Sequence, residues 1–96
     1  MRNFKKLNIW TDGIKLVKEV YKISKNLPEK EKFGLKSQIS RAVVSIPSNI
    51  AKGSGRNSDV EFKRYLEIAM GSSFELETQL VIIEELGFVN EEALVP

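Results

Sequence analysis

The sequence contains no cysteine and no histidine, and its 96 residues include only three prolines, six glycines and one tryptophan. Without cysteine the chain can form no disulfide and has no thiolate nucleophile, and without either residue type it cannot build the Cys/His sites that hold structural zinc. The absence of histidine also removes the commonest general base. We therefore expect no catalytic site, no metal and no cofactor.

Long apolar runs are also missing. No stretch of about 18 apolar residues is present, and the first residues, MRNFKK, lack the apolar segment of a signal peptide. We therefore expect a cytoplasmic protein that does not enter a membrane. With 96 residues, of which 42% are hydrophobic and 29% charged, the chain is expected to fold as one domain spanning residues 1–96.

The net charge of +2 conceals a strong charge asymmetry along the chain. Residues 1–36 carry a net charge of +6 and residues 37–64 a net charge of +3, whereas residues 65–96 carry seven glutamates and no lysine or arginine. Such a distribution can attract a polyanion, or it can bring oppositely charged faces of neighbouring subunits together. It is also compatible with ordinary solvated helix surfaces.

Apolar periodicity predicts three long helices, at about residues 7–25, 34–52 and 58–86. The third would be on the order of 40 Å long at 1.5 Å per residue, which favours an elongated bundle over a sphere. Asn90 and the glutamates after it resemble the start of a fourth helix. The predicted fold is therefore an all-α, antiparallel up-down four-helix bundle whose fourth helix is truncated or barely begun in this chain.

The second and third helices contain recognisable boundary signals. Pro47 lies inside the second helix and predicts a kink near residues 43–47, while Gly53 predicts a left-handed end to it. Ser58 followed by Glu61 forms a capping box at the start of the third helix, and Gly87 is expected at its end.

The first helix carries apolar residues over roughly 200° of its circumference, whereas one core-facing stripe needs little more than about 100°. A helix of this kind has to bury two faces, and an oligomer interface would cover the second one. The residues expected at that interface come from the first and third helices: Ile9, Leu16, Val20, Ile23, Met70, Phe74 and Val81.

The remaining arc of the first helix carries a continuous row of lysines, and the end of the second helix carries further basic residues. Phosphate contacts from such residues give salt-sensitive binding that is largely independent of sequence. The N-terminal Arg2, Lys5 and Lys6 add to this charge. The candidate nucleic-acid-binding residues are Lys15, Lys18, Lys22, Lys25, Arg41, Lys52 and Arg56.

Three alternatives remain open at this stage. A scaffold that binds a protein partner would use the acidic third helix against a basic surface. An enzyme would need a deep polar pocket around Arg41, Ser45 and Lys52, because Lys52 is the one base near the serines. The Gly53–Arg56 segment resembles a phosphate-binding loop only weakly, since no Gly-Lys-Ser/Thr follows it and no strand precedes it.

The sequence resembles the four-helix-bundle proteins encoded in intervening sequences of bacterial 23S ribosomal RNA genes. The resemblance covers essentially the whole chain. It is carried by FKKLxxW at residues 4–10, LPxxExFGLxxQIxRA at residues 27–42, SIPSNIAxG at residues 45–53 and GSxxELExQL at residues 71–80. The family is in turn similar to accessory proteins of diversity-generating retroelements, whose basic pentamers bind nucleic acid and a reverse transcriptase.

This resemblance implies a four-helix bundle that assembles as a homopentamer, and it supplies no catalytic residue. Among the matching polar residues, Arg41, Ser45, Asn49 and Ser72 are expected at bundle or subunit interfaces. Lys52 departs from the family pattern, which usually has glutamate there, so any salt bridge carried over at that position is in doubt. The expected function is non-catalytic binding of RNA or another nucleic acid by an oligomer, and the alternative is a protein-interaction scaffold.

Overall fold

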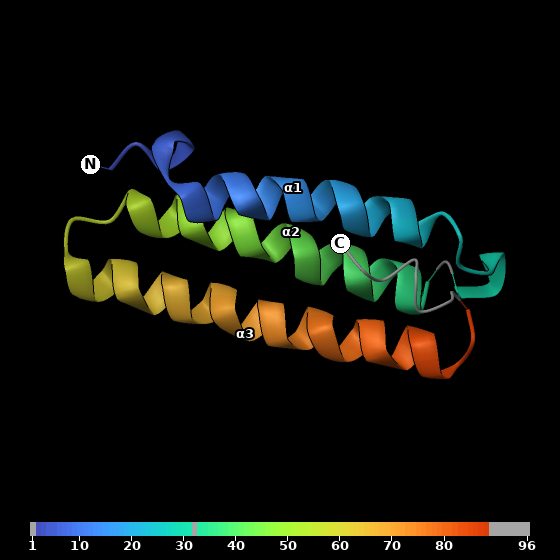
Figure 1. The fold of residues 1–96 in the computed structure, drawn as a ribbon. Helices are drawn as coiled ribbons and strands as arrows, with labels where there is room; N and C mark the ends of the chain where they lie inside the picture. Colours follow the sequence, from blue (N-terminus) through green and yellow to red (C-terminus); the bar gives the residue numbers. More distant parts are fainter. Residues whose placement is uncertain (1, 32, 89–96) are drawn as a thin grey trace.

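The computed structural model describes residues 2–31 and 33–88 and contains three long helices in this range. They are α1 (Asn8–Ser24), α2 (Leu35–Ser54) and α3 (Asp59–Glu85), with short 3-10 turns at Phe4–Lys6 and Glu29–Glu31. Figure 1 shows successive helices running antiparallel in an elongated molecule of 44 × 20 × 18 Å. The predicted all-α class and three helix positions are confirmed. The predicted start of a fourth helix near residue 90 lies outside the described residues.

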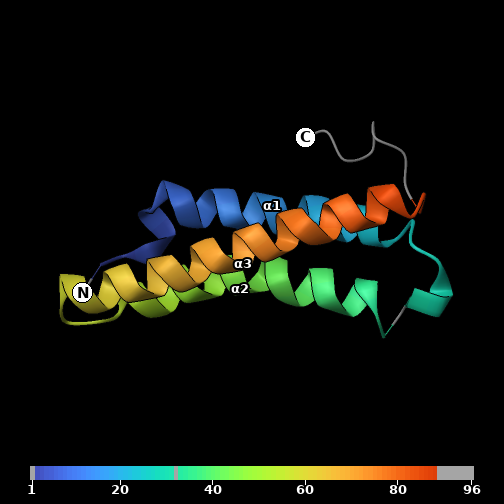
Figure 2. The same cartoon turned by 90° about the horizontal axis from the view of Figure 1, so that it is seen from below.

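Helix α2 supplies half of the buried apolar core, because α1 and α3 both pack along it (Figures 1 and 2). Ile39 and Val43 of α2 are fully buried, as is Ile83 of α3. Leu27, between α1 and α2, is 4% exposed and closes the end of the core. In the described part of the chain, no helix combines the length and apolarity needed to cross a membrane.

Helix α2 runs unbroken through Pro47, whose ring packs against α1 at Gly13. A Cβ atom added to Gly13 would lie 3.2 Å from the Pro47 Cβ atom. The missing side chain of Gly13 therefore allows α1 to approach α2 closely at Pro47, the residue of α2 that has no backbone N–H.

The predicted left-handed end of α2 at Gly53 is wrong. Gly53 is buried inside the helix, which continues to Ser54, and its φ angle is not positive. A Cβ atom at Gly53 would lie only 2.6 Å from the Tyr65 Cβ atom and 3.0 Å from Phe62 Cδ1. Glycine at this position serves the close approach of α2 and α3 rather than the helix end.

The predicted ends of α3 are confirmed. The Ser58 side chain accepts a hydrogen bond from the Glu61 backbone N–H, which is one of the two hydrogen bonds of a capping box. At the other end Gly87 adopts a φ angle of 74°, the left-handed conformation in which glycine carries no steric penalty.

A polar link joins α2 to α3 near the middle of the molecule. The hydroxyl oxygens of Ser45 and Ser72 are 2.8 Å apart, and the Asn49 Nδ2 atom donates to the Ser45 carbonyl at 2.8 Å and to its hydroxyl at 2.9 Å. The small side chains let the helices approach while their polar atoms stay paired. The expectation that Ser45, Asn49 and Ser72 act within the bundle fits this geometry.

Candidate nucleic-acid interface

The lysine stripe, formed by Lys15, Lys18, Lys22 and Lys25, lies on one exposed face of α1. Their spacing of three and four residues keeps them on that face, because an α-helix turns once in 3.6 residues. They line a surface depression of about 400 Å³ together with Glu19 and Tyr21. The structure therefore brings together the four lysines that the sequence assigned to this helix.

One of these lysines is paired with a carboxylate among the described residues. The Lys22 Nζ atom lies 3.3 Å from Glu19 Oε1, an exposed pair three residues apart on the helix. Lys15, Lys18 and Lys25 form no ion pair with any residue in 2–31 or 33–88. Exposed ion pairs of the Glu19–Lys22 kind contribute little to stability, so Lys22 can exchange Glu19 for another anion. With four lysines and Glu19 in its lining, the depression presents a net positive surface to solvent.

Tyr21 also lies on this surface, and 46% of it is exposed. It continues the three- and four-residue spacing of the apolar residues Ile14 and Val17, a pattern that is typical of a side chain facing the core. It follows Lys18 by three residues and precedes Lys25 by four, so it lies on the same ridge as both. The sequence signal for its exposure is its position between Lys18 and Lys25, but the apolar periodicity of the helix favoured a buried position.

The second-helix candidates do not join the lysine stripe. Arg41 is exposed and lines a separate depression of about 500 Å³ between α2 and α3, with Gln38, Glu75, Thr78 and Gln79. Gln79 is 7% exposed, and its Nε2 atom donates to Glu75 Oε1 at 3.3 Å while its own Oε1 atom is buried without a partner among the described residues. Arg41 therefore belongs to a mixed-charge environment, unlike the lysines.

The remaining basic candidates lie near the turn between α2 and α3. Lys52 is exposed, whereas Arg56 is engaged with Tyr65, donating from Nη2 to the phenolic oxygen at 2.6 Å and stacking 4.9 Å from the ring centroid. Arg2 pairs with Asp59 and lies 4.3 Å from the centroid of the Phe62 ring. Arg2 and Arg56 thus make contacts within the chain at its surface, which sequence reasoning missed because their partners are set by tertiary structure.

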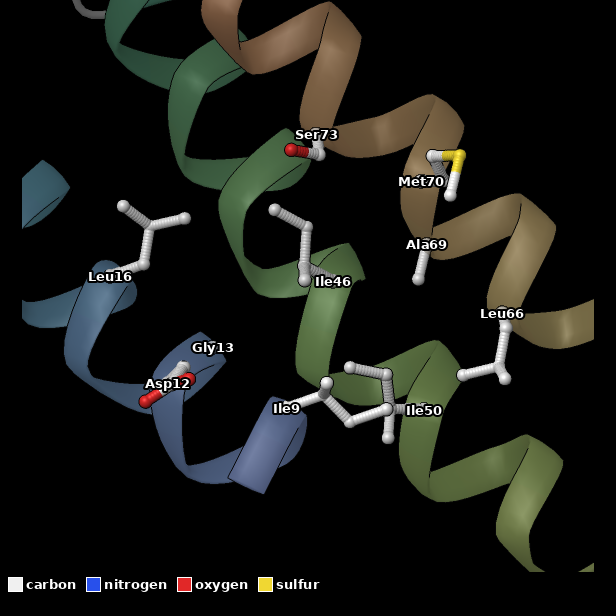
Figure 3. A pocket seen from close by; sticks show the side chains of 10 residues that line it. All are labelled: Ile9, Asp12, Gly13, Leu16, Ile46, Ile50, Leu66, Ala69, Met70 and Ser73. Carbon is white, nitrogen blue, oxygen red and sulfur yellow. The ribbon is translucent and has the colours of Figure 1, made fainter. Parts of the chain in front are cut away.

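Some of the predicted interface residues meet around one apolar groove. Ile9, Leu16 and Met70 line a groove of about 450 Å³ between α1 and α3, with Ile46 and Ile50 of α2 also in its wall (Figure 3). Ile9 is 47% exposed and Met70 is 58% exposed. The groove therefore brings together predicted interface residues of α1 and α3.

The other predicted interface residues lie in different environments. Phe74 and Val81 of α3 are 61% and 54% exposed, which leaves their side chains available to a partner. Ile23 is half-buried, and Val20 is only 1% exposed because it packs in the core of the chain itself. Val20 therefore has almost no surface to offer to a second molecule.

The described residues do not assemble the Ser45 and Lys52 pair that the enzyme alternative requires. Within 2–31 and 33–88 there is no cluster of three acidic side chains that could hold a metal ion. The serine closest to an enzyme hypothesis, Ser45, is hydrogen-bonded to Ser72 and Asn49 rather than to Lys52. This arrangement is that of a packing contact between helices.

The sequence matches the family model described as 23S rRNA-intervening sequence protein over residues 5–95. No curated protein matches the chain. Because the match spans nearly the whole sequence, the chain belongs to the 23S rRNA-intervening sequence protein family.

Proposed function

We propose that this member of the 23S rRNA-intervening sequence protein family is a non-catalytic, oligomeric helical-bundle protein that binds RNA through the lysine stripe of α1. The observation that carries the proposal is the exposure of all four lysines on one helix face, three of them without an acidic partner in the described part of the chain. Phosphates of an RNA backbone would supply that missing negative charge.

The proposed binding mode is electrostatic and independent of base sequence along the stripe. From Lys15 to Lys25 the helix rises about 15 Å, so the stripe can follow one stretch of phosphate backbone. Each lysine that contacts a phosphate displaces a counterion, which makes the affinity fall as salt rises. Several subunits in one assembly would add their contacts through effective concentration.

The proposed assembly is a homo-oligomer, with a pentamer as the specific expectation. Its support is the exposed apolar surface formed by Ile9, Met70, Phe74 and Val81, which we call the apolar face. When a partner covers apolar side chains this exposed on a small domain, the free energy falls by about 25 cal/mol per Å² of buried apolar area. A second copy of the chain would bring the same surface and would also multiply the lysine stripe.

The direct test is charge reversal on the stripe. Changing Lys15, Lys22 and Lys25 together to glutamate should abolish RNA binding at low salt, measured by fluorescence anisotropy of a labelled oligonucleotide. The matched control changes Lys30, Lys63 and Arg64 to glutamate, which shifts the net charge equally from exposed positions off the stripe. Equal loss in both variants, or retained binding in the first, would refute the stripe as the binding surface.

A protein-interaction scaffold is the second candidate, favoured by the glutamates around the apolar face. Glu67, Glu77 and Glu84 are all exposed on α3, whose second half contains no basic residue. A partner with a basic surface and an apolar centre would complement this helix. The scaffold predicts that the purified protein retains a protein partner, and that it shows no nucleic-acid binding even at low salt.

A further inference from the structure

Tyr21 lies among the lysines without an assigned role in the fold. Almost half of its surface is exposed, and its hydroxyl forms no hydrogen bond with residues 2–31 or 33–88. Water can hydrate the hydroxyl at this exposed position, while the ring presents apolar aromatic surface to solvent. The ring instead lines the depression that Lys18 and Lys25 share with it.

We infer that Tyr21 is a stacking platform for an unpaired base, and that the lysine stripe therefore binds single-stranded nucleic acid in preference to a duplex. The inference rests on the proposed function, since it assigns a ligand class to the same surface. Lys18 and Lys25 flank the ring along the helix, about 10 Å apart at 1.5 Å per residue. Phosphates on either side of one nucleotide can thus be held while its base lies on the ring.

Base stacking on Tyr21 distinguishes a single strand from a duplex. A base can stack on an aromatic side chain only when it is free of its neighbours, as in single strands, loops and ends. A duplex offers phosphates to the four lysines but keeps its bases stacked internally, so Tyr21 gains nothing from it. The tyrosine ring therefore converts a charge-driven surface into one that discriminates between the two forms.

The charges around the ring agree with this role. Lys18, Lys22 and Lys25 line the depression beside Tyr21, and Glu19 is the one carboxylate there. Its Oε1 atom pairs with Lys22 at 3.3 Å, so the repulsion that it would exert on a phosphate is partly offset. The ring is available to any of the four bases, since each has a π-face, and the surface is expected to select strandedness rather than sequence.

The experiment compares substitutions at Tyr21 that vary the aromatic surface. Affinity is measured by anisotropy at low salt for a single-stranded RNA of mixed sequence, the matching DNA single strand, and the corresponding RNA duplex. Tyr21→Leu keeps an apolar side chain without a π-face and should weaken single-strand binding at least about fivefold while leaving duplex binding unchanged. Tyr21→Phe should bind as the wild type does, and Tyr21→Trp should bind single strands more tightly.

The outcomes distinguish the inference from the proposed function. If the wild type binds both forms and Tyr21→Leu changes neither, the stacking role is overturned while the lysine stripe stands. If no oligonucleotide binds at low salt, the proposed function fails and the inference fails with it. Equal loss for single strands and duplex in Tyr21→Leu also overturns the inference, because stacking affects one form only. The RNA and DNA single strands should bind with similar affinity, because stacking a base on the ring makes no contact with the 2′-hydroxyl of the sugar. A large difference in affinity between them would contradict the stacking account.

Discussion

Gly53 and Gly71 both lie inside helices, yet their surroundings differ sharply. An added Cβ atom would lie 2.6 Å from the Tyr65 Cβ atom at Gly53, whereas at Gly71 it would meet no atom within 4 Å beyond its chain neighbours and the adjacent backbone of its own helix. The first glycine is required by the contact between α2 and α3. The second costs α3 conformational entropy without providing space for a neighbour.

These two positions give a paired prediction on stability. Gly53→Ala should lower the free energy of unfolding by about 1–3 kcal/mol, because the backbones of α2 and α3 must separate. Gly71→Ala should raise it by about 0.5–1 kcal/mol, since alanine is favoured in an exposed helix interior. Urea denaturation followed by circular dichroism measures both. A Gly53→Ala protein as stable as the wild type would show that this close approach is not needed.

The error at Gly53 shows which residue properties the sequence conceals. A glycine near the end of an apolar pattern predicts a helix stop equally well whether it is needed for a φ angle or for a close contact. The contact partner, Tyr65, is 12 residues away and its position depends on how α2 and α3 pack. Gly87 was correctly predicted because the chain ends its helix there through local geometry alone.

At the scale of the helix, the Ser58 cap sets the start of α3. Its side chain satisfies the Glu61 N–H, one of the donors that the first turn of a helix leaves unpaired. Ser58→Ala should therefore lower the free energy of unfolding by about 1 kcal/mol, measured by urea denaturation. Ser58→Asp is the control, because aspartate can accept the same hydrogen bond and should retain most of the stability. A loss of equal size in both variants would contradict the capping role.

The link between α2 and α3 gives a second prediction at this scale. Ser45→Ala should lower the free energy of unfolding by about 1 kcal/mol, because it leaves the partly buried Ser72 hydroxyl without its partner. Ser72→Ala should lower it by less, because the Ser45 hydroxyl still accepts a hydrogen bond from Asn49. The double variant should cost less than the sum of the two by about 0.5 kcal/mol or more. A full double-mutant cycle by urea denaturation measures this coupling. Strict additivity would mean that the two hydroxyls do not interact.

The positions of the helices were predictable, because apolar periodicity and helix-end signals are local in sequence. The exposure of each face of a helix was not predictable. The wide apolar arc of α1 correctly indicated more than one environment, and Val20 proved to be core while Ile9 and Tyr21 remained half exposed. Which edge of the arc is covered depends on where α2 and α3 lie. That information is tertiary, so it could not be obtained from the periodicity of α1.

At the scale of the whole molecule, the apolar face and the lysine stripe occupy different surfaces. The four lysines were predictable as a group because they share one helix, whereas Arg41, Lys52 and Arg56 are spread over α2 and the turn after it and have separate environments. Predicting that separation requires the side-chain partners, such as Tyr65 for Arg56. The site is therefore predictable where one element carries it.

The assembly can be tested independently of nucleic acid. Light scattering should give a multiple of the 10.9 kDa chain mass, with five copies as the specific expectation. Changing Met70 and Phe74 to glutamate should reduce that mass, because charges would be buried at the interface. Val60→Glu is the control, since Val60 is an 80% exposed apolar residue of α3 outside the apolar face. A wild-type monomer, or an assembly insensitive to the Met70 and Phe74 changes, would refute this interface.

The salt dependence of RNA binding tests the central claim most directly. Affinity for a single-stranded RNA is measured by anisotropy between low and moderate salt. The logarithm of the binding constant should fall against the logarithm of the salt concentration with a slope of about −2.8 or steeper, since each of the four lysines contributes about −0.7 on a single strand. Replacing Lys15, Lys18, Lys22 and Lys25 with glutamine should remove most of that slope together with the affinity. Absence of binding at low salt, or an unchanged slope after the replacement, would contradict the account.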